Sequence, residues 1–208
     1  MSGRDEAAAA AAAAEAGEAE TEVLSPTPQA TLDHFNSIPW VASRLSDRTF
    51  RPVHLSRTLT HAGKGHTLMA ATWNTPTTIS HILSTYRPPL TASNRKGEIR
   101  RFYTFGGGLN AHPNLLHGGV IATILDSTMG NVIGQELPAH AATFTVKLTV
   151  EYKRPVTTPG TVMARAWIVA VEGRKVWVEG VVEDGEGNVH ARAEGMWLRA
   201  KGKGKGKL

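Results

Sequence analysis

The residues best suited to chemistry lie in the run from His117 to Asp126, which reads HGGVIATILD. Two glycines open this run, apolar residues follow, and one carboxylate stands inside the helix that the pattern predicts. The glycines leave backbone N–H groups open at the helix start, where the helix dipole favours an anion or a developing oxyanion. An acid among apolar neighbours is costly to bury unless it has a partner or a chemical task. Together, these features suggest acyl-transfer chemistry.

Other chemistries find less support in the sequence. The chain has no cysteine, which excludes disulfides, thiolate metal sites and a cysteine nucleophile. His112 and His117 have no evident third partner, so we expect no metal site and no cofactor. The glycines at 106–108 lack the lysine of a phosphate-binding loop, and no G-x-S-x-G nucleophile elbow occurs.

The elements that would position this run follow one another closely. The pattern predicts a strand over residues 98–105 and a long apolar helix over residues 117–133. Four further strands, which we interpret as an antiparallel meander, are predicted over residues 143–152, 161–171, 174–183 and 189–199. A helix that is apolar almost all round must be surrounded, and a curved antiparallel sheet of five strands can wrap it. We therefore predict an α+β domain over residues 98–200.

Residues 31–92 precede this domain and read as a helical extension that packs on the core. The Thr-Pro pair at 75–76 is typical of a helix start. Apolar residues follow it at helical spacing, namely Ile79, Ile82, Leu83 and Tyr86. The Pro-Pro pair at 88–89 ends the element, so the sequence predicts a helix over residues 75–86.

The two ends of the chain differ in charge, although the net charge is +5. Residues 1–22 sum to −5 and residues 199–208 to +5, so the part between them also carries +5. The low-complexity segment 1–30 is predicted to be a disordered tail, and residues 201–208 a flexible basic tail. Charge alone does not choose between nucleic acid, an anionic surface and a phosphorylated small molecule as partner.

The sequence also bears on location. No run of about eighteen apolar residues occurs, so we expect no transmembrane segment. The alanine-rich start is too weakly hydrophobic for a secretory signal and too acidic for a mitochondrial presequence. We expect a cytoplasmic protein, with the mitochondrion as the alternative.

A longer motif around the central run resembles a known family. The segment from Asn110 to Gly119, NAHPNLLHGG, followed by Asp126 and Gly130, is similar to the hotdog-fold acyl-CoA thioesterases. The likeness is to the branch with the bacterial phenylacetic-acid-pathway thioesterase and the animal thioesterase superfamily members. Residues 144–155, FTVKLTVEYKRP, look like that family's second strand. The wider flank, from Asp33-His34-Phe35 to Pro39-Trp40 and over the predicted helix at 75–86, looks like fungal members. The resemblance implies a hotdog fold, a curved sheet wrapped around a central helix.

The resemblance also implies roles for individual residues. The backbone amide of Gly118 would polarise the thioester carbonyl, and Gly119 would allow close approach. Asp126 would act as the nucleophile or as the general base for the attacking water. Thr145 would supply an assisting hydroxyl, and His117 would orient the loop. The implied substrate is an acyl-CoA, rather than nucleic acid.

Four further residues are candidates for substrate binding. Family members often have an asparagine six residues before the histidine and a glycine three before it, whereas this chain has Ala111 and Asn114 there. Asn114 tolerates the left-handed conformation and can replace the glycine. Asn110, one place early, is the candidate for contact with the acyl group. Lys153 and Arg154 lie beside the family's coenzyme A region and could bind its phosphates.

Helix geometry predicts how the site assembles. The nine residues from His117 to Asp126 advance about 13.5 Å and turn about 900°, which leaves the two ends of the run on opposite sides of the helix. One subunit can hardly bring both to one carbonyl, so we predict a composite site shared across a homodimer. Pairing two sheets edge to edge would also remove exposed strand edges, and a tetramer of two such dimers is an alternative assembly.

Simpler interpretations stay open. Asp126 could be a structural acid, His117 a helix cap, Thr145 an ordinary strand residue, and Lys153 and Arg154 surface charges. Two other functions also fit the fold, a hydratase of enoyl or hydroxyacyl thioesters and a non-catalytic acyl-CoA-binding protein.

Overall fold

The computed structural model describes residues 28–53, 57, 59, 62–91, 96–137 and 142–200 of the chain. The predicted basic tail over residues 201–208 lies outside the described residues, and so does the predicted N-terminal tail up to residue 27. The boundary of that tail at residue 30 is wrong, because helix α2 (Gln29–Asn36) already begins at Gln29.

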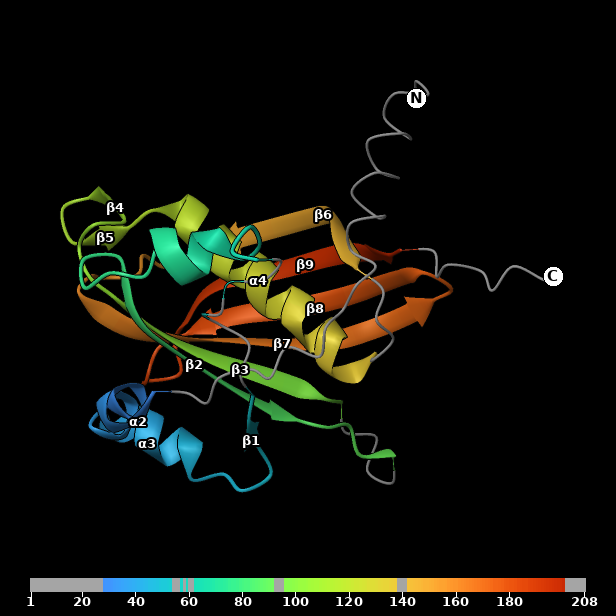
Figure 1. The fold of residues 1–208 in the computed structure, drawn as a ribbon, viewed down its shortest axis with the longest axis horizontal. Coiled ribbons are helices and arrows are strands. Elements are labelled where there is room, and N and C mark those ends of the chain that lie inside the picture. The colour runs from blue at the N-terminus through green and yellow to red at the C-terminus, as the bar shows by residue number, and fades with distance from the viewer. Residues whose placement is uncertain are drawn as a thin grey trace.

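One antiparallel sheet of seven strands forms the body of the protein (Figure 1). In spatial order its strands are β1 (Arg51–Pro52), β2 (Ile79–Arg87), β3 (Glu98–Phe105), β7 (Gly160–Glu172), β8 (Lys175–Glu183), β9 (Val189–Arg199) and β6 (Thr143–Tyr152). A separate ribbon of β4 (Asn110–His112) and β5 (Leu115–Leu116) leads into the long helix α4 (Gly118–Glu136). The five strands and the long helix predicted after residue 98 are confirmed.

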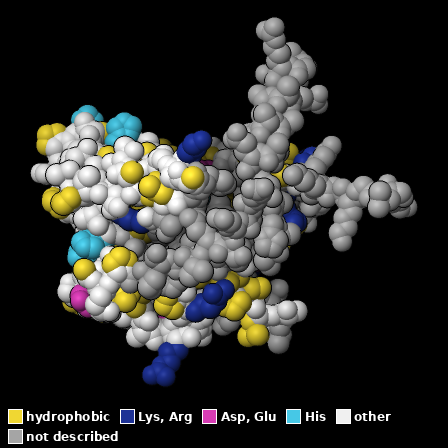
Figure 2. Space-filling view, viewed as in Figure 1, with side chains coloured by type: hydrophobic (Ala, Val, Ile, Leu, Met, Phe, Trp, Pro, Cys, Tyr) yellow, Lys and Arg dark blue, Asp and Glu magenta, His cyan; other side chains and the backbone are white. Residues whose placement is uncertain are grey.

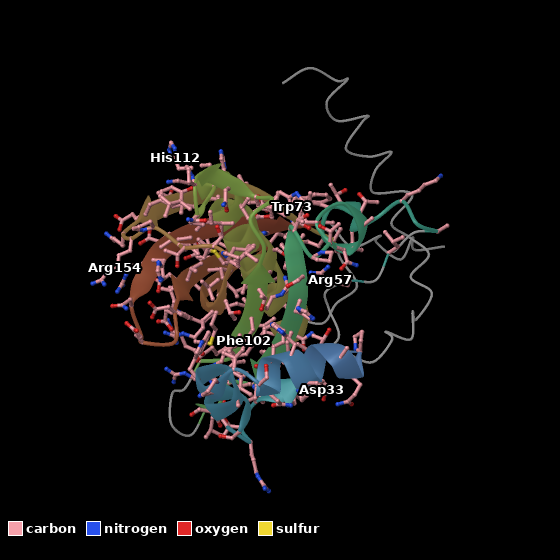
Figure 3. All side chains as sticks on the ribbon, turned by 90° about the vertical axis from the view of Figure 1, so that its left-hand side faces the viewer. Asp33, Arg57, Trp73, Phe102, His112 and Arg154 are labelled. Carbon is pink, nitrogen blue, oxygen red and sulfur yellow. The ribbon has the colours of Figure 1, made fainter. Side chains whose placement is uncertain are left out.

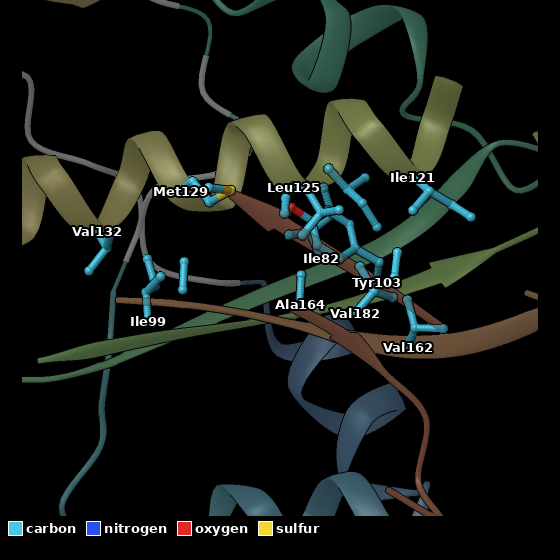
Figure 4. Packing of buried hydrophobic residues seen from close by; sticks show 14 of the residues in the cluster. Ile82, Ile99, Tyr103, Ile121, Leu125, Met129, Val132, Val162, Ala164 and Val182 are labelled. Atoms are coloured by element: carbon cyan, nitrogen blue, oxygen red, sulfur yellow. The ribbon is translucent and has the colours of Figure 1, made fainter. Parts of the chain in front are cut away.

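Helix α4 lies against one face of the sheet and packs on β3, β6, β7, β8 and β9. Its buried side chains recur at helical spacing: Val120, Ile121, Ile124, Leu125, Thr128, Met129, Val132 and Ile133. Figure 4 shows Leu125 and Met129 directed toward the sheet residues Ile82 and Ala164. This arrangement is the predicted hotdog fold of the α+β class. The other side of α4 stays half-exposed at Thr123 and elsewhere, so the predicted enclosure on every side is wrong.

The opposite face of the sheet carries two short helices, α2 and α3 (Pro39–Leu45) (Figure 1). A second apolar cluster joins them to β2, β3 and β7; its buried members are Phe35, Val41, Leu83, Phe102 and Met163. Figure 3 shows Phe102 directed toward these helices. The start of the predicted extension is therefore helical and packs on the sheet.

The predicted helix over residues 75–86 is wrong, because residues 79–87 form strand β2 and pair with β3. Ile82 and Tyr86 pack beneath α4, whereas Leu83 packs beneath α2 and α3. A strand covered on both faces buries both sets of side chains, which produced an apolar spacing like that of a helix. Thr75 Oγ1 does accept a hydrogen bond from the Thr78 N–H at 3.2 Å, but the chain then turns into β2.

The predicted four-strand meander is wrong in one respect. Strands β7, β8 and β9 are consecutive neighbours, but β6 pairs with β9 at the edge of the sheet and does not contact β7 as a neighbour. The sheet also gains β1 and β2 beyond the five strands expected. Side-chain alternation identifies a strand but carries little information about its partner. As a consequence, β6 presents an open edge beside α4.

Candidate active site

The start of α4 is held by a side-chain cap. His117 is the N-cap residue, and its Nδ1 accepts a hydrogen bond from the Gly119 N–H at 2.8 Å. A Cβ atom on Gly119 would lie 2.9 Å from that Nδ1, so a larger residue would push the cap aside. His117 therefore orients the loop as a cap, and the sequence requires a glycine at 119 to let it do so.

Gly118 offers an open donor. Among the described residues, none accepts a hydrogen bond from the Gly118 N–H, which lies at the positive end of the helix dipole. The Gly118 carbonyl accepts a hydrogen bond from the Tyr152 hydroxyl at 3.0 Å. Tyr152, at the end of β6, was missed as a site residue. The apolar alternation of the strand predicts which face of the sheet Tyr152 lies on, but it does not predict a partner for its hydroxyl.

Asp126 is half-buried on α4 and has a hydrogen-bond partner. Its Oδ1 accepts a hydrogen bond from the Thr145 Oγ1 at 2.7 Å, so the structure brings these two predicted residues together. Both line a cavity of about 360 Å³, to which Ser127, His66 and Met69 also contribute. Residues 66–69 form part of the cavity wall but lie far from Asp126 along the chain, so the sequence did not predict their contribution.

A β-bulge explains how Thr145 reaches Asp126. Strict alternation along β6 would place Thr145 on the face opposite Leu148. In the structure, Thr145 lies opposite Trp197 and Lys147 opposite Met196, which leaves Val146 as an extra residue on β6. The bulge shifts the alternation by one residue, so that Thr145 contacts α4 and Leu148 still packs on the core.

Gly118 and Asp126 are separated along the helix. Because α4 begins at Gly118, the two residues are eight positions apart, which corresponds to about 12 Å of axial rise and a net rotation of about 80°. The sequence predicted that the helix start and Asp126 lie on opposite sides of the helix. For Gly118 this prediction is wrong, because a rotation of about 80° leaves it roughly a quarter turn from Asp126. The axial separation nevertheless exceeds the reach of one reacting carbonyl.

The loop before α4 is shaped by two asparagines. Asn114 adopts a left-handed conformation with φ +60°, as predicted for the residue that replaces a glycine. Its carbonyl accepts a hydrogen bond from the Thr158 N–H at 2.9 Å, and Asn110 Oδ1 accepts one from the Thr158 Oγ1 at 2.5 Å. Asn110 thus ties the loop to Thr158, and its predicted contact with the acyl group stays a prediction.

The predicted phosphate-binding residues are exposed at the end of β6. Lys153 Nζ lies 2.5 Å from the Glu151 Oε2, and Arg154 Nη1 donates to the Asn188 Oδ1 at 2.8 Å. Figure 3 places Arg154 at the surface. On the face seen in Figure 2, the described lysines and arginines stand apart from one another rather than forming one patch.

Two features of the described residues bear on other functions. No three side chains of His, Asp or Glu in these ranges gather as metal ligands would. None of the described helices combines the length and apolar character needed to cross a membrane.

Residues 113–191, which contain the start of α4, Asp126 and Thr145, match the family model of the thioesterase superfamily. The similarity to the thioesterase superfamily thus extends over less than half of the chain. The acyl-coenzyme A thioesterase THEM4 of Rattus norvegicus is 31% identical over 107 residues, which are 50% of this chain and 45% of that protein. The chain thus spans about half the length of this relative.

Other similar proteins include fungal ones. An uncharacterized mitochondrial protein of Candida albicans is 29% identical and matches 46% of this chain and 43% of its own length. Verlamelin biosynthesis protein B of a Lecanicillium species is 25% identical over 84% of this chain and 90% of that protein. Among solved structures, a Bacillus halodurans protein with CoA has 28% identity and a TM-score of 0.46, covering 52% of this chain and 70% of its own.

Proposed function

We propose that this chain hydrolyses acyl-CoA thioesters to a free carboxylic acid and coenzyme A. The observation that carries the proposal is the half-buried Asp126, held by Thr145 at 2.7 Å inside a cavity on the helix whose first N–H is an open donor. Rat THEM4, which is named an acyl-coenzyme A thioesterase, aligns with half of this chain and supports the assignment.

The chemistry follows from these groups. The thioester carbonyl oxygen accepts a hydrogen bond from the Gly118 N–H, which stabilises the negative charge that develops on it. Asp126 attacks the carbonyl carbon directly or removes a proton from the attacking water. The C–S bond then breaks and the thiolate takes up a proton. If water is the nucleophile, this step releases the carboxylic acid directly; if Asp126 is the nucleophile, water then hydrolyses the acyl–aspartate anhydride, which releases the carboxylic acid and restores the carboxylate.

The same proposal includes a composite site in a homodimer. The axial separation of about 12 Å between Gly118 and Asp126 supports it, because a second α4 can supply the missing half. Strand β6 supports it further, since its edge is open and its side chains Phe144 and Val146 are 49% and 55% exposed. If the β6 strands of two subunits paired, the open edge and the exposed apolar side chains would both lie in the interface. A tetramer of such dimers, a cytoplasmic location and independence of cofactors stay predictions.

The direct test is release of free thiol from a panel of acyl-CoA substrates of different chain length. Asp126→Asn should lower kcat by at least about 100-fold, because the amide is neither base nor nucleophile. Asp33→Asn is the matched control, since Asp33 is exposed on α2, on the far face of the sheet (Figure 3). Full activity of Asp126→Asn would contradict the proposed mechanism.

A further inference from the structure

A buried arginine lies directly behind the cavity wall. Arg101 on β3 is 1% exposed and points toward α4, opposite Ser84 on β2. Its Nε donates to the Ser84 Oγ at 3.1 Å, and its Nη1 donates to the Ser127 Oγ at 2.7 Å. Its guanidinium also lies 5.3 Å from the centroid of the Tyr103 ring. All of these partners are neutral.

A second arginine lies close to the first. Arg57 donates to the Asn74 side chain and to the Ile79 carbonyl, both neutral, and no described residue accepts from its buried Nε. Burial, followed by the charge of Arg101, lowers the pKa of Arg57 to about 10. Figure 3 shows Arg57 beside β2 and well away from Arg154, so these two basic residues belong to different sites.

The charge of this pair is not balanced by the part of the chain that the structure describes. On the opposite face of the sheet, half-buried arginines do have carboxylate partners: Arg87 contacts Glu98 at 2.8 Å, and Arg165 contacts Glu183 at 2.6 Å. No described carboxylate forms an ion pair with Arg57 or Arg101. A buried cation without a counter-charge is costly, so an anion from outside the chain would relieve this cost.

Ser127 connects the arginines to the cavity. It lines the same cavity as Asp126 and follows it in sequence, so the two Cα atoms are about 3.8 Å apart. Because the Ser127 Oγ accepts from Arg101, its own proton is left to donate to a group in the cavity. An anion bound there would share the cavity with the thioester carbon that Asp126 attacks, so that a short acyl chain could join the two.

We propose that Ser127, with the positive charge of Arg101 and Arg57 behind it, binds a carboxylate at the far end of the acyl group, so that the preferred substrates are CoA thioesters of short dicarboxylic acids. The claim that the ligand is a CoA thioester rests on the proposed function. The claim that a carboxylate binds here rests only on the buried arginines and Ser127. The acid end is recognised by charge-assisted hydrogen bonds, and the aliphatic segment spans the distance to Asp126.

The binding test uses thermal unfolding of the full chain with adipate, hexanamide or inorganic phosphate. Adipate should raise Tm more than hexanamide or phosphate does, because only adipate has a carboxylate on an aliphatic segment. Arg101→Met removes the charge but keeps an unbranched side chain, and it should abolish the adipate shift. Arg48→Met, at an exposed position on the loop after α3, is the matched control and should keep the shift.

The kinetic test compares kcat/KM for adipyl-CoA and hexanoyl-CoA, which differ only in the terminal carboxylate. The unchanged protein should prefer adipyl-CoA, and Arg101→Met should lower the ratio of the two values by about 10- to 100-fold. Ser127→Ala should lower the ratio in the same direction. It provides a second variant that leaves the buried guanidinium in place if Arg101→Met does not fold.

The outcomes are separable. An unchanged substrate ratio in both variants, or an adipate shift that survives Arg101→Met, overturns the carboxylate site. A phosphate shift as large as the adipate shift, without preference for adipyl-CoA, overturns the assignment to dicarboxylic substrates. An Arg101-dependent adipate shift in a protein that cleaves no thioester supports the carboxylate site and contradicts the proposed function.

Discussion

At the residue scale, the pair of Asp126 and Thr145 determines what the cavity can do. Thr145 occupies Oδ1 of the carboxylate, and no described residue donates to Oδ2. One oxygen is therefore held while the other stays available to the substrate or to water. A carboxylate that is oriented in this way suits the geometry of a base or nucleophile better than one that rotates freely.

Removing the hydroxyl of Thr145 should free the carboxylate to rotate. We expect Thr145→Ala to lower kcat by about 10- to 100-fold, since a hydrogen bond to a charged group is lost. Thr145→Ser keeps the donor and serves as the control. Equal kcat values for the Ala variant and the unchanged protein would show that Thr145 is only a strand residue.

Glu136, near the end of α4, carries a different prediction. Its Oε1 is buried without a hydrogen-bond partner among the described residues, and burial raises the pKa of Glu136. A group whose pKa is higher in the folded state stabilises the fold while it is protonated. That contribution is complete below its ordinary pKa of about 4.3 and is lost as pH rises through the raised value.

Glu136→Gln should therefore become more stable relative to the unchanged protein as pH rises from about 4 to 8. The measurement is the difference in Tm between the two proteins across this pH range. Glu172→Gln, at an exposed position at the end of β7, is the control and should show no such trend. A Tm difference that stays constant with pH would contradict the assignment to Glu136.

At the element scale, the alignment of β6 on α4 depends on the bulge at Val146. Two hydrogen bonds join these elements, from Thr145 to Asp126 and from Tyr152 to the Gly118 carbonyl. They lie on either side of the extra residue, so both can form only if the alternation of β6 shifts between them.

Deleting Val146 should restore strict alternation and break this arrangement. Either Thr145 turns away from Asp126, or Leu148 and Tyr152 turn away from the core and from Gly118. We expect lower Tm, lower thioesterase activity, or both, measured by thermal unfolding and thiol release. Val146→Ala keeps the bulge and is the control, and unaltered properties of the deletion would contradict this interpretation.

At the scale of the whole molecule, the composite site can be tested with mixed dimers. Gly118→Pro removes the N–H donor, and proline fits the first position of a helix. Its Cβ would lie 3.4 Å from the Tyr152 ring, which is van der Waals contact. The preceding His117 has φ −63° and ψ 134°, which a residue before proline readily adopts. Alone, Gly118→Pro should lower kcat by about 100- to 1,000-fold while keeping the fold.

Combining the two inactive proteins separates the models of the site. In a mixed dimer of Gly118→Pro and Asp126→Asn, one of the two shared sites contains both native residues. Refolding an equimolar mixture should therefore recover about a quarter of the unchanged activity, since half of the dimers are mixed. No recovery, or an active monomer by size-exclusion chromatography, would exclude a site shared between subunits.

The features that could be predicted from the amino-acid sequence are local. The glycines at 118 and 119, the apolar pattern of α4 and the alternation of the last strands predict their elements because they follow from helix and strand geometry. The left-handed Asn114 was predicted on another ground, because it stands where the resembling family often has a glycine and asparagine tolerates that conformation. The candidate acid, Asp126, stood out because it interrupts an apolar pattern.

Only the tertiary structure decided which of these elements meet. Strand β2 is buried on both faces, so its apolar spacing resembles that of a helix. Strand β6 pairs with β9, although nothing in the alternation of β6 predicts that partner. The bulge that turns Thr145 toward Asp126 depends on pairing with β9. Likewise, Arg101 has the sequence context of an ordinary strand residue, and only packing places it behind Ser127, where no carboxylate of the described residues forms an ion pair with it. Pairing, burial and counter-charge are properties of residues distant along the chain, so the three-dimensional fold alone determines them.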